Sequence, residues 1–311
     1  MKHLSVIVPL YNEKEVVIKE LIKNLKIYLS KITTNWKIIL VDDGSTNNCW
    51  DAILKASNDD INISGIKLSK NFGQHCAIKA GIDNTKSEFT IVIDGDMQDD
   101  PKYIEELYSN AKQDYDVVYC ERSERKDFLQ IFFSKIFYFL FNFLSKNKLN
   151  QKIANFCIFN QKILNQLKKE KLTHMSFFAS IKGLSPKEKF IKTIRNQRLQ
   201  GSKPTYSLSN RVKLAKNTIV SFSDRLIYFS IASGILFFIV SIFATIYLII
   251  KKLYLDPSAP VLGWTSLSTI ILFSFGLTNF SIGIIGLYIN SIHNIVKEQN
   301  PYFVDEKINL D

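Results

Sequence analysis

Residues 88–101, EFTIVIDGDMQDDP, join an apolar stretch to a dense group of carboxylates. Residues 89–93 are predicted to form a buried strand, and Pro101 suits the first turn of a following helix. Carboxylates this close repel one another unless a cation lies among them, and their oxygens suit Mg²⁺ or Mn²⁺ together with phosphate oxygens. An acidic turn that caps a helix is the alternative for this stretch alone. The side chains concerned are Asp94, Asp96, Gln98, Asp99 and Asp100.

Strands and helices are predicted to alternate along the N-terminal part of the chain. Such alternation implies a parallel sheet with right-handed crossovers, in which ligands bind beyond the carboxyl ends of the strands. Because polar clusters follow the first, second and fourth strands, we expect them to converge on one crevice. No Gly-x-Gly-x-x-Gly follows the first strand, which argues against a dinucleotide-binding domain. Strands are expected at 4–10, 37–41, 63–68, 89–93 and 116–120, and helices at 13–30, 47–56, 71–82 and 101–112.

Two long stretches without charged residues, 226–250 and 261–292, distinguish the last quarter of the chain. Each exceeds the roughly 20 apolar residues that cross a bilayer, so we expect a transmembrane hairpin. No secretory signal precedes the first strand, so the N-terminal part and both chain ends are expected on the cytoplasmic side of the cell (inner) membrane. Basic residues outside the spans agree with that orientation, whereas Lys251 and Lys252, between the spans, count against it.

The chain has 40 Lys and Arg against 29 Asp and Glu, and this formal net charge of +11 favours an anionic partner. No basic helix or base-stacking aromatic motif points to nucleic acid, whereas a lipid headgroup surface and phosphorylated substrates account for the charge. The cysteines are far apart in the sequence and form no metal-binding pair, so reduced thiols in a reducing compartment are expected. They are Cys49, Cys76, Cys120 and Cys157.

Several motifs, in order along nearly the whole chain, resemble family 2 glycosyltransferases. They are VPLYNE at 8–13, VDDGST at 41–46, LSKNFGQHCAIKAGI at 68–82 and IDGDMQDDP at 93–101. More narrowly, the chain resembles the polyprenyl-phosphate glycosyltransferases related to dolichol-phosphate mannosyltransferase. Their membrane-anchored bacterial members are similar in RNQRLQGSKPTYSLSNRVKLA at 195–215, in SFSDRL at 221–226 and in a two-span hairpin.

The resemblance implies an α/β catalytic domain of the GT-A type, Rossmann-like with a mostly parallel sheet, followed by the transmembrane hairpin. The nucleotide-sugar-binding core is expected at 1–125, and acceptor-side and membrane-interface helices at 126–225. The two spans, about 226–250 and 265–290, fall within 226–292, and a cytoplasmic tail follows at 293–311. The resemblance also allows a homo-oligomer.

The resemblance places a nucleotide-sugar donor against the first half of the sheet. Asp42 can accept a hydrogen bond from a uracil or guanine N–H, and Tyr11 offers a stacking face. Ser45 is expected mainly to cap a helix. Arg122 and Arg125, which follow the fifth strand, are expected to reach phosphate oxygens. The alternative is that they belong to a solvated run of charges. The donor-side residues implied are Pro9, Tyr11, Glu13, Asp42, Asp94, Arg122 and Arg125.

Asp94, Asp96 and Gln98 match the family's metal motif. The resemblance implies that Mg²⁺ or Mn²⁺ bridges the donor phosphates and stabilises charge as the nucleoside diphosphate leaves. Asp96 is the ligand most firmly implied, whereas Asp94 can hold the ribose instead, and Asp99 is expected to support the start of the next helix. Further along, Arg198 and Lys203 match a family segment near the donor and acceptor phosphates.

The acceptor-side motif departs from the family's Asp-Phe-Arg. The chain has Asn155-Phe156-Cys157, closer to the Asn-Phe-Gly of one subgroup, which puts a general base at Asn155 in doubt. A phosphate monoester has a second pKa of about 6 and needs no base. Direct inverting attack by a polyprenyl phosphate, undecaprenyl or dolichyl, is therefore compatible with Asn155, whereas a sugar or protein hydroxyl acceptor requires the missing acid.

The segment 127–146 has a narrow polar stripe on an otherwise apolar helix, which suits the bilayer interface; burial in the core is the alternative. A processive polysaccharide synthase usually has Gln-x-x-Arg-Trp and more spans, and this chain has neither. A phosphatase of the Asp-x-Asp-x-Thr type is disfavoured by Gln98, and a non-catalytic membrane protein that keeps the fold remains an alternative. His75, His174 and His293 are expected to be structural or on the surface.

Overall fold

The computed structural model of the 311-residue chain describes residues 2–122, 153–169, 177–194, 263–297 and 301–310, with single helical positions between 232 and 250. The predicted interface helix at 127–146 and the segment 195–225 lie outside these ranges, and so do Arg125, Arg198 and Lys203.

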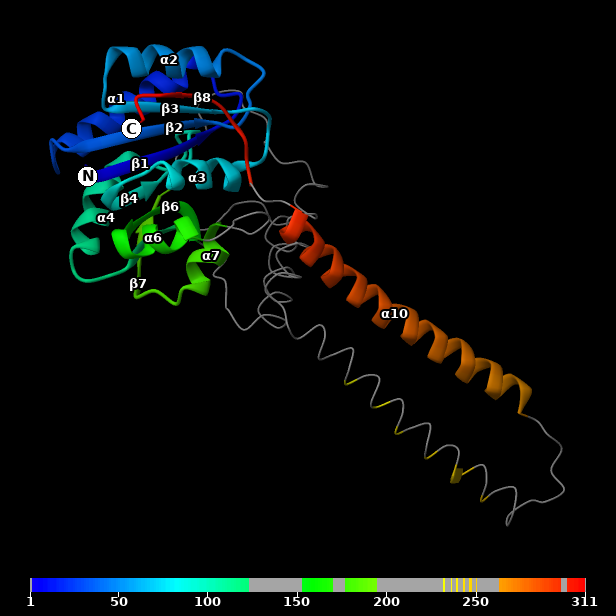
Figure 1. The fold of residues 1–311 in the computed structure, drawn as a ribbon. Helices are drawn as coiled ribbons and strands as arrows, with labels where there is room; N and C mark the ends of the chain where they lie inside the picture. Colours follow the sequence, from blue (N-terminus) through cyan, green and yellow to red (C-terminus); the bar gives the residue numbers. More distant parts are fainter. Residues whose placement is uncertain are drawn as a thin grey trace.

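One mixed sheet of eight strands runs through the described part of the chain, in the order β7-β5-β6-β4-β1-β2-β3-β8 (Figure 1). The pairs β4–β1, β1–β2 and β2–β3 are parallel, as the alternation of strands and helices predicts, and β5 is parallel to β7. By contrast, β6 runs antiparallel to β4 and β5, and β8 runs antiparallel to β3. The strands are β1 (Lys2–Leu10), β2 (Trp36–Asp42), β3 (Ile63–Leu68), β4 (Ser87–Val92), β5 (Val117–Arg122), β6 (Ile153–Asn160), β7 (Glu188–Thr193) and β8 (Val304–Ile308).

Helices cover both faces of this sheet because successive side chains along a strand point to opposite sides. On β1, Val6 and Val8 pack in a core with α1, α2 and α4, while Ile7 packs in a second core with α3, α6 and α7. The helices are α1 (Glu15–Ser30), α2 (Cys49–Asp59), α3 (Gln74–Asp83), the 3₁₀ turn η1 (Pro101–Tyr103), α4 (Ile104–Ala111), α6 (Gln161–Lys169) and α7 (Phe177–Gly183). The predicted strands and helices of the first 122 residues are confirmed, with ends within three residues of those expected.

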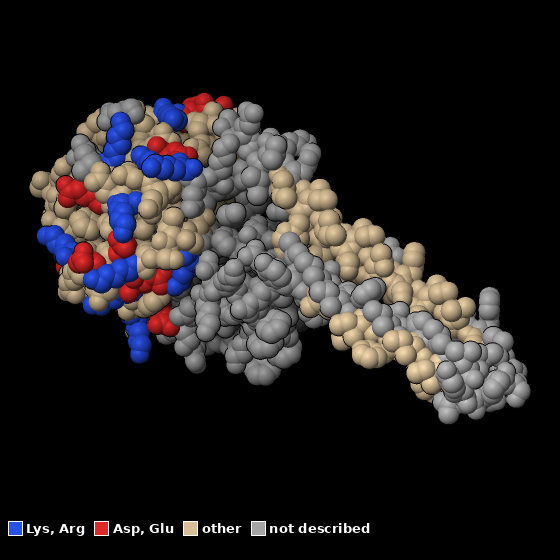
Figure 2. Space-filling model, turned by 60° about the horizontal axis from the view of Figure 1, so that its bottom comes forward, with Lys and Arg blue, Asp and Glu red and all other residues tan. Residues whose placement is uncertain are grey.

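Helix α10 (Trp264–Lys297) extends away from the sheet (Figure 1). Many of its large apolar side chains are exposed, and Figure 2 shows the charged side chains over the sheet domain rather than on the coloured atoms of this helix. No helix in the described ranges has the combined length and apolar character of a membrane crossing. The transmembrane hairpin therefore stays a prediction. The exposed side chains are Leu267, Ile270, Ile271, Phe273, Phe275, Phe280, Ile282, Ile285, Leu287, Ile289 and Ile292.

Beyond α10 the chain returns to the sheet, where the predicted tail contributes an eighth strand. Asn309 holds this segment in place: its carbonyl oxygen accepts hydrogen bonds from Lys37 Nζ (2.6 Å) and Ser64 Oγ (2.7 Å). Its side-chain amide donates to the carbonyls of Ser57 (2.6 Å) and Ile63 (2.9 Å). The C-terminal segment is therefore an integral part of the sheet domain.

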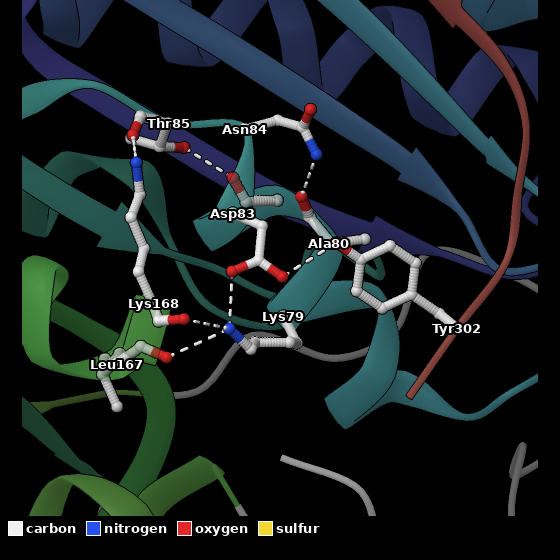
Figure 3. A network of polar contacts seen from close by, with 9 residues as sticks. Lys79, Ala80, Asp83, Asn84, Thr85, Leu167, Lys168 and Tyr302 are labelled. Atoms are coloured by element: carbon white, nitrogen blue, oxygen red, sulfur yellow. Dashed lines mark hydrogen bonds and ion pairs between the residues drawn. The ribbon is translucent and has the colours of Figure 1, made fainter. Parts of the chain in front are cut away.

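A buried lysine joins three separate parts of the fold (Figure 3). Lys79 on α3 is 3% exposed, and its ammonium donates to Asp83 Oδ1 (2.5 Å) and to the carbonyls of Leu167 and Lys168 (3.1 Å each) at the end of α6. Tyr302, in the C-terminal segment, donates its hydroxyl to the other oxygen of Asp83 (2.8 Å). Lys79 and Asp83 thus tie α6 and the C-terminal segment to α3.

We expect Lys79→Met to lower the free energy of unfolding by about 2–4 kcal/mol, because two carbonyls and a carboxylate lose their common donor. The midpoint of thermal unfolding of the purified full chain should fall by roughly 5–10 °C. Lys307→Met is the matched control. This lysine is exposed, and within the described part of the chain its ammonium donates one hydrogen bond, to Asn84 Oδ1 (2.8 Å). Equal midpoints for the two variants would show that the Lys79 network does not stabilise the fold.

Candidate active site

The polar loops that follow β1, β2 and β4 meet at one edge of the sheet. Leu10 and Asp42 are opposite one another in the β1–β2 register, and β4 lies on the other side of β1. Since β5 runs in the same direction as β4, its last residue, Arg122, is placed at this edge as well. The topology therefore brings together the donor-side positions that the sequence predicts within the described residues.

The loops after β1 and β2 form one unit through Asn12. This residue adopts a positive φ of 56°, its backbone N–H donates to Ser45 Oγ (2.8 Å), and its Oδ1 accepts from the N–H of Thr46 (2.9 Å). Ser45 was expected to cap a helix, and this is wrong: α2 begins at Cys49, whose N–H donates to Asn47 Oδ1 (3.2 Å), with Asn48 at the N-cap position. Ser45 instead joins the two loops. Tyr11 and Glu13, which flank Asn12 in the first loop, are half-buried.

Asp42, at the end of β2, has one buried carboxylate oxygen that lacks a hydrogen bond from the described part of the chain. Its Oδ1 accepts from the N–H of Ser45 (3.0 Å), whereas Oδ2 has no partner among the described residues. Burial raises the pKa of Asp42, because desolvation disfavours the charged form, and the hydrogen bonds from Ser45 only partly offset this. An unsatisfied buried acceptor is costly, and an N–H group of a ligand would satisfy it.

Asp43 fixes the loop before α3. Its two oxygens accept from the backbone N–H groups of Phe72 (2.8 Å) and Gly73 (2.9 Å), and burial raises its pKa to about 7. Gly44 follows with a φ of 66°, and a Cβ there would lie 2.3 Å from the backbone carbon of Lys70. The pair Asp43-Gly44 thus does more than form a turn, because it determines where α3 starts.

The acidic loop after β4 is packed tightly against the end of β1. A Cβ at Gly95 would lie 2.3 Å from Leu10 Cδ2 and 3.2 Å from the carbonyl oxygen of Pro9, so a larger residue there would require the buried Leu10 side chain to shift. Asp96 Oδ1 accepts from the N–H of Gln98 (3.1 Å), and Met97 between them has a positive φ of 57°. The loop is therefore held in a defined turn that places the carboxylates of Asp94 and Asp96 at the edge of the sheet.

The next helix starts as predicted at Pro101, but its cap is a different residue. Asp99 was expected to support this helix start, whereas the structure gives that role to Asp100, whose Oδ1 accepts from the N–H of Lys102 (3.0 Å). Asp99 itself is 4% exposed. The sequence alone does not distinguish two adjacent aspartates, because the choice depends on how the preceding loop turns.

Asp94 is contacted from two distant elements. Its Oδ1 accepts from Gln74 Nε2 (2.6 Å), at the first residue of α3, and from Asn155 Nδ2 (2.9 Å), on β6. The predicted acceptor-side residue Asn155 is therefore in direct contact with the acidic loop. Sequence reasoning missed Gln74 as a site residue, although it lies within the motif at 68–82 that supports the family resemblance.

The donor set at the acidic loop fits a hard divalent cation that takes part of its shell from a ligand. Among the described residues no group of three or more His, Cys, Asp or Glu side chains forms a complete metal site. Two carboxylates and one amide oxygen, from Asp94, Asp96 and Gln98, suit Mg²⁺ or Mn²⁺ when phosphate oxygens and water fill the other positions. A zinc-type cage of nitrogen and sulfur ligands does not match these residues.

His75 has a structural role, which is one of the two roles expected for it. Its Nδ1 accepts from the N–H of Phe177 (3.4 Å), and burial lowers its pKa to about 4, so the imidazole is neutral at physiological pH. The side chains of Pro9 and the four cysteines are buried, and the cysteines are free thiols as predicted. His174 lies outside the described residues.

Comparison with known proteins identifies the family. The model of "Glycosyl transferase family 2" matches residues 5–168. "Uncharacterized glycosyltransferase YkoT" of Bacillus subtilis (strain 168) is 32% identical over 314 residues, covering 97% of this chain and 91% of the relative. "Undecaprenyl-phosphate 4-deoxy-4-formamido-L-arabinose transferase" of Salmonella choleraesuis (strain SC-B67) is 27% identical over 315 residues, covering 99% of this chain and 94% of the relative.

Among solved structures, glucosyl-3-phosphoglycerate synthase from Mycobacterium tuberculosis is 13% identical, with a TM-score of 0.48, and the match covers 70% of this chain and 78% of that chain. The family model extends over more than half of the 311 residues, and its match includes β1 through β6 with all of the loops described above. The chain therefore belongs to glycosyl transferase family 2 and is a glycosyltransferase with the α/β fold described above.

Proposed function

We propose that the protein transfers a single sugar from a UDP- or GDP-sugar to a polyprenyl phosphate at the cytoplasmic face of the cell membrane, with inversion at the anomeric carbon. The observation that carries this proposal is the pairing, at one sheet edge, of a buried unsatisfied Asp42 oxygen with the acidic loop at Asp94 and Asp96. The Asp42 oxygen supplies an acceptor for an N–H of the nucleotide base, and the acidic loop supplies a site for the diphosphate with its cation.

On the donor side, Asp42 accepts a hydrogen bond from the base, and Tyr11 stacks on it. Because Asp42 is fully covered, the side chains above it have to move aside when the donor enters. Pro9 and Glu13 are proposed to contact the nucleotide, and Arg122 and Arg125 to bind the diphosphate. Asp94, Asp96 and Gln98 hold Mg²⁺ or Mn²⁺, which when bound neutralises charge on the leaving nucleoside diphosphate.

On the acceptor side, a phosphate oxygen forms the new bond to the anomeric carbon while the bond to the nucleoside diphosphate breaks. With a second pKa of about 6, the phosphate monoester is already deprotonated at neutral pH, so no residue has to remove a proton. The Asn155 contact supports this, because its side-chain nitrogen donates to Asp94 and does not act as a base. Arg198 and Lys203 are proposed to bind the phosphates.

Membrane association is proposed from the apolar surface of α10. Exposed Leu, Ile and Phe side chains follow one another along the helix, and water solvates such a surface poorly. The uncharged sequence at 226–250 and the basic net charge are consistent with lipid contact near anionic headgroups. A relative aligned over 99% of the chain bears the name of an undecaprenyl-phosphate sugar transferase, which supports the choice of a lipid phosphate acceptor.

We expect Asp96→Ala to abolish transfer, because it removes a carboxylate from the proposed cation site, while leaving the protein folded and membrane-associated. The assay follows labelled sugar from a panel of UDP- and GDP-sugars into chloroform-extractable polyprenyl phosphate with Mg²⁺, Mn²⁺ or EDTA. Asp59→Ala, at the exposed end of α2, is the control and should keep normal turnover. Near-normal turnover of the Asp96 variant would contradict the proposed cation site, and label in a polymer would point to a different acceptor.

For Asp42→Asn we expect opposite effects on binding and on stability. The dissociation constant for UDP or GDP should rise about 10–100-fold, because an amide N–H₂ would face the base N–H. The free energy of unfolding of Asp42→Asn near neutral pH should rise or stay equal. The pKa of Asp42 is higher in the folded than in the unfolded state, so ionisation of the wild-type carboxyl destabilises the folded state as pH rises through the folded pKa, and an asparagine does not ionise. Calorimetry and thermal unfolding measure the two effects; unchanged nucleotide affinity would remove Asp42 from the donor site.

A further inference from the structure

We propose that Gln74 and Asn155 are positioning residues that together orient the Asp94 carboxylate, so that Asn155 acts on the donor side of the reaction through Asp94. Both amide nitrogens lie within hydrogen-bond distance of the same oxygen, Asp94 Oδ1, at 2.6 Å and 2.9 Å. This inference rests on the proposed function, because it assigns a task to residues around the proposed donor and cation site.

The chemistry of the three side chains determines the direction of these hydrogen bonds. A carboxylate only accepts, so each amide must present its nitrogen to Asp94, and the reverse orientation would bring two acceptor oxygens together. Hydrogen bonds to an ionised group are shorter and stronger than those between neutral groups. Two donors on one oxygen therefore stabilise the charged form of Asp94 and restrict the rotation of its carboxylate plane.

Each amide is itself held by the fold. Gln74 is the first residue of α3, directly after Gly73, whose N–H, with that of Phe72, is bound by Asp43. Asn155 lies on β6, which is registered against β4 through the Val92–Cys157 pair. The Asp94 side chain is thus fixed from one side by a helix start and from the other by an antiparallel strand. Groups that orient a metal-binding carboxylate in this way typically change metal affinity 10–100-fold, in order of magnitude, when they are removed.

The contact also explains why an amide occupies position 155. An aspartate there would place a second carboxylate about 3 Å from Asp94, and two carboxylates that share one site cannot both remain ionised at low cost. The next residues offer no compensating charge, because Phe156 and Cys157 are buried and uncharged. If position 155 lacked a general base that the reaction needs, Asn155→Asp would speed up transfer. If Asn155 positions Asp94, Asn155→Asp should slow transfer.

The test is Mn²⁺ binding to the purified full chain with UDP or GDP, without acceptor, measured by electron paramagnetic resonance. We expect Asn155→Leu and Gln74→Leu, which remove the N–H donor without adding charge, to weaken Mn²⁺ binding about 10–100-fold. In the transfer assay, the Mn²⁺ concentration for half-maximal rate should rise by a similar factor, while kcat at saturating Mn²⁺ stays close to that of the wild type.

Asn160→Leu is the matched control, because Asn160 lies on the same strand and its Nδ2 donates to Asp116 Oδ1 (3.0 Å) in the same type of contact. Five residues along a strand separate it from Asn155 by roughly 16 Å. This variant also removes an amide donor from a carboxylate, so it should lose thermal stability yet keep Mn²⁺ affinity within about twofold of the wild type. A loss caused by general destabilisation would affect both variants alike.

Three outcomes would overturn the inference. Unchanged Mn²⁺ affinity in both Asn155→Leu and Gln74→Leu would show that the amides do not position Asp94 for a cation. A faster Asn155→Asp enzyme, or a change confined to the KM for polyprenyl phosphate, would assign position 155 to the acceptor and leave the proposed function intact. A wild-type protein that binds no Mn²⁺ with either nucleotide would overturn the proposed function and this inference together.

Discussion

Negative charge withdrawn from water at one edge of the sheet is the constraint on which the local structure depends. Asp42, Asp43, Asp94 and Asp96 all lie at this edge, and carboxylates that lose hydration need N–H donors in its place. The fold supplies them from the backbone of Ser45, Phe72, Gly73 and Gln98 and from the amides of Gln74 and Asn155. The backbone turns at Gly44, Gly73 and Met97, which all have positive φ values. These turns bring N–H donors towards the carboxylates or allow neighbouring loops to pack closely.

The sequence predicts the first half of this arrangement well, because the information is local. Apolar runs such as residues 38–41 specify buried strands, and strand–helix alternation specifies a parallel order, so the convergence of the polar loops follows from topology alone. Strand β8 could not be predicted in this way. Its sequence, VDEKI, is polar, and it becomes a strand because β3, more than 230 residues earlier in the chain, offers a free edge.

The difference between local sequence information and contacts between distant residues also applies within the candidate site. The types of residue in the acidic loop indicate a cation and a diphosphate, but they do not indicate which side chains orient which. Asp43 has the sequence context of a turn, and only the closeness of the loop at residues 70–73 makes it an anchor for α3. Gln74 and Asn155 are more than 80 positions apart, and no local pattern links them to Asp94.

The C-terminal segment limits how far the apolar helix can move relative to the site. Six residues separate the end of α10 at Lys297 from the start of β8 at Val304, and even a fully extended chain of that length spans only about 20 Å. Tyr302, within this link, is bound to Asp83 on α3, and α3 begins with Gln74. A lipid surface that holds the end of α10 would therefore stay close to the sheet domain. An acceptor phosphate arriving from that surface carries close to two negative charges and must approach the carboxylates of the acidic loop. An amide at position 155 adds no further repulsion there, whereas a carboxylate would, so Asn155 is compatible with the proposed phosphate acceptor.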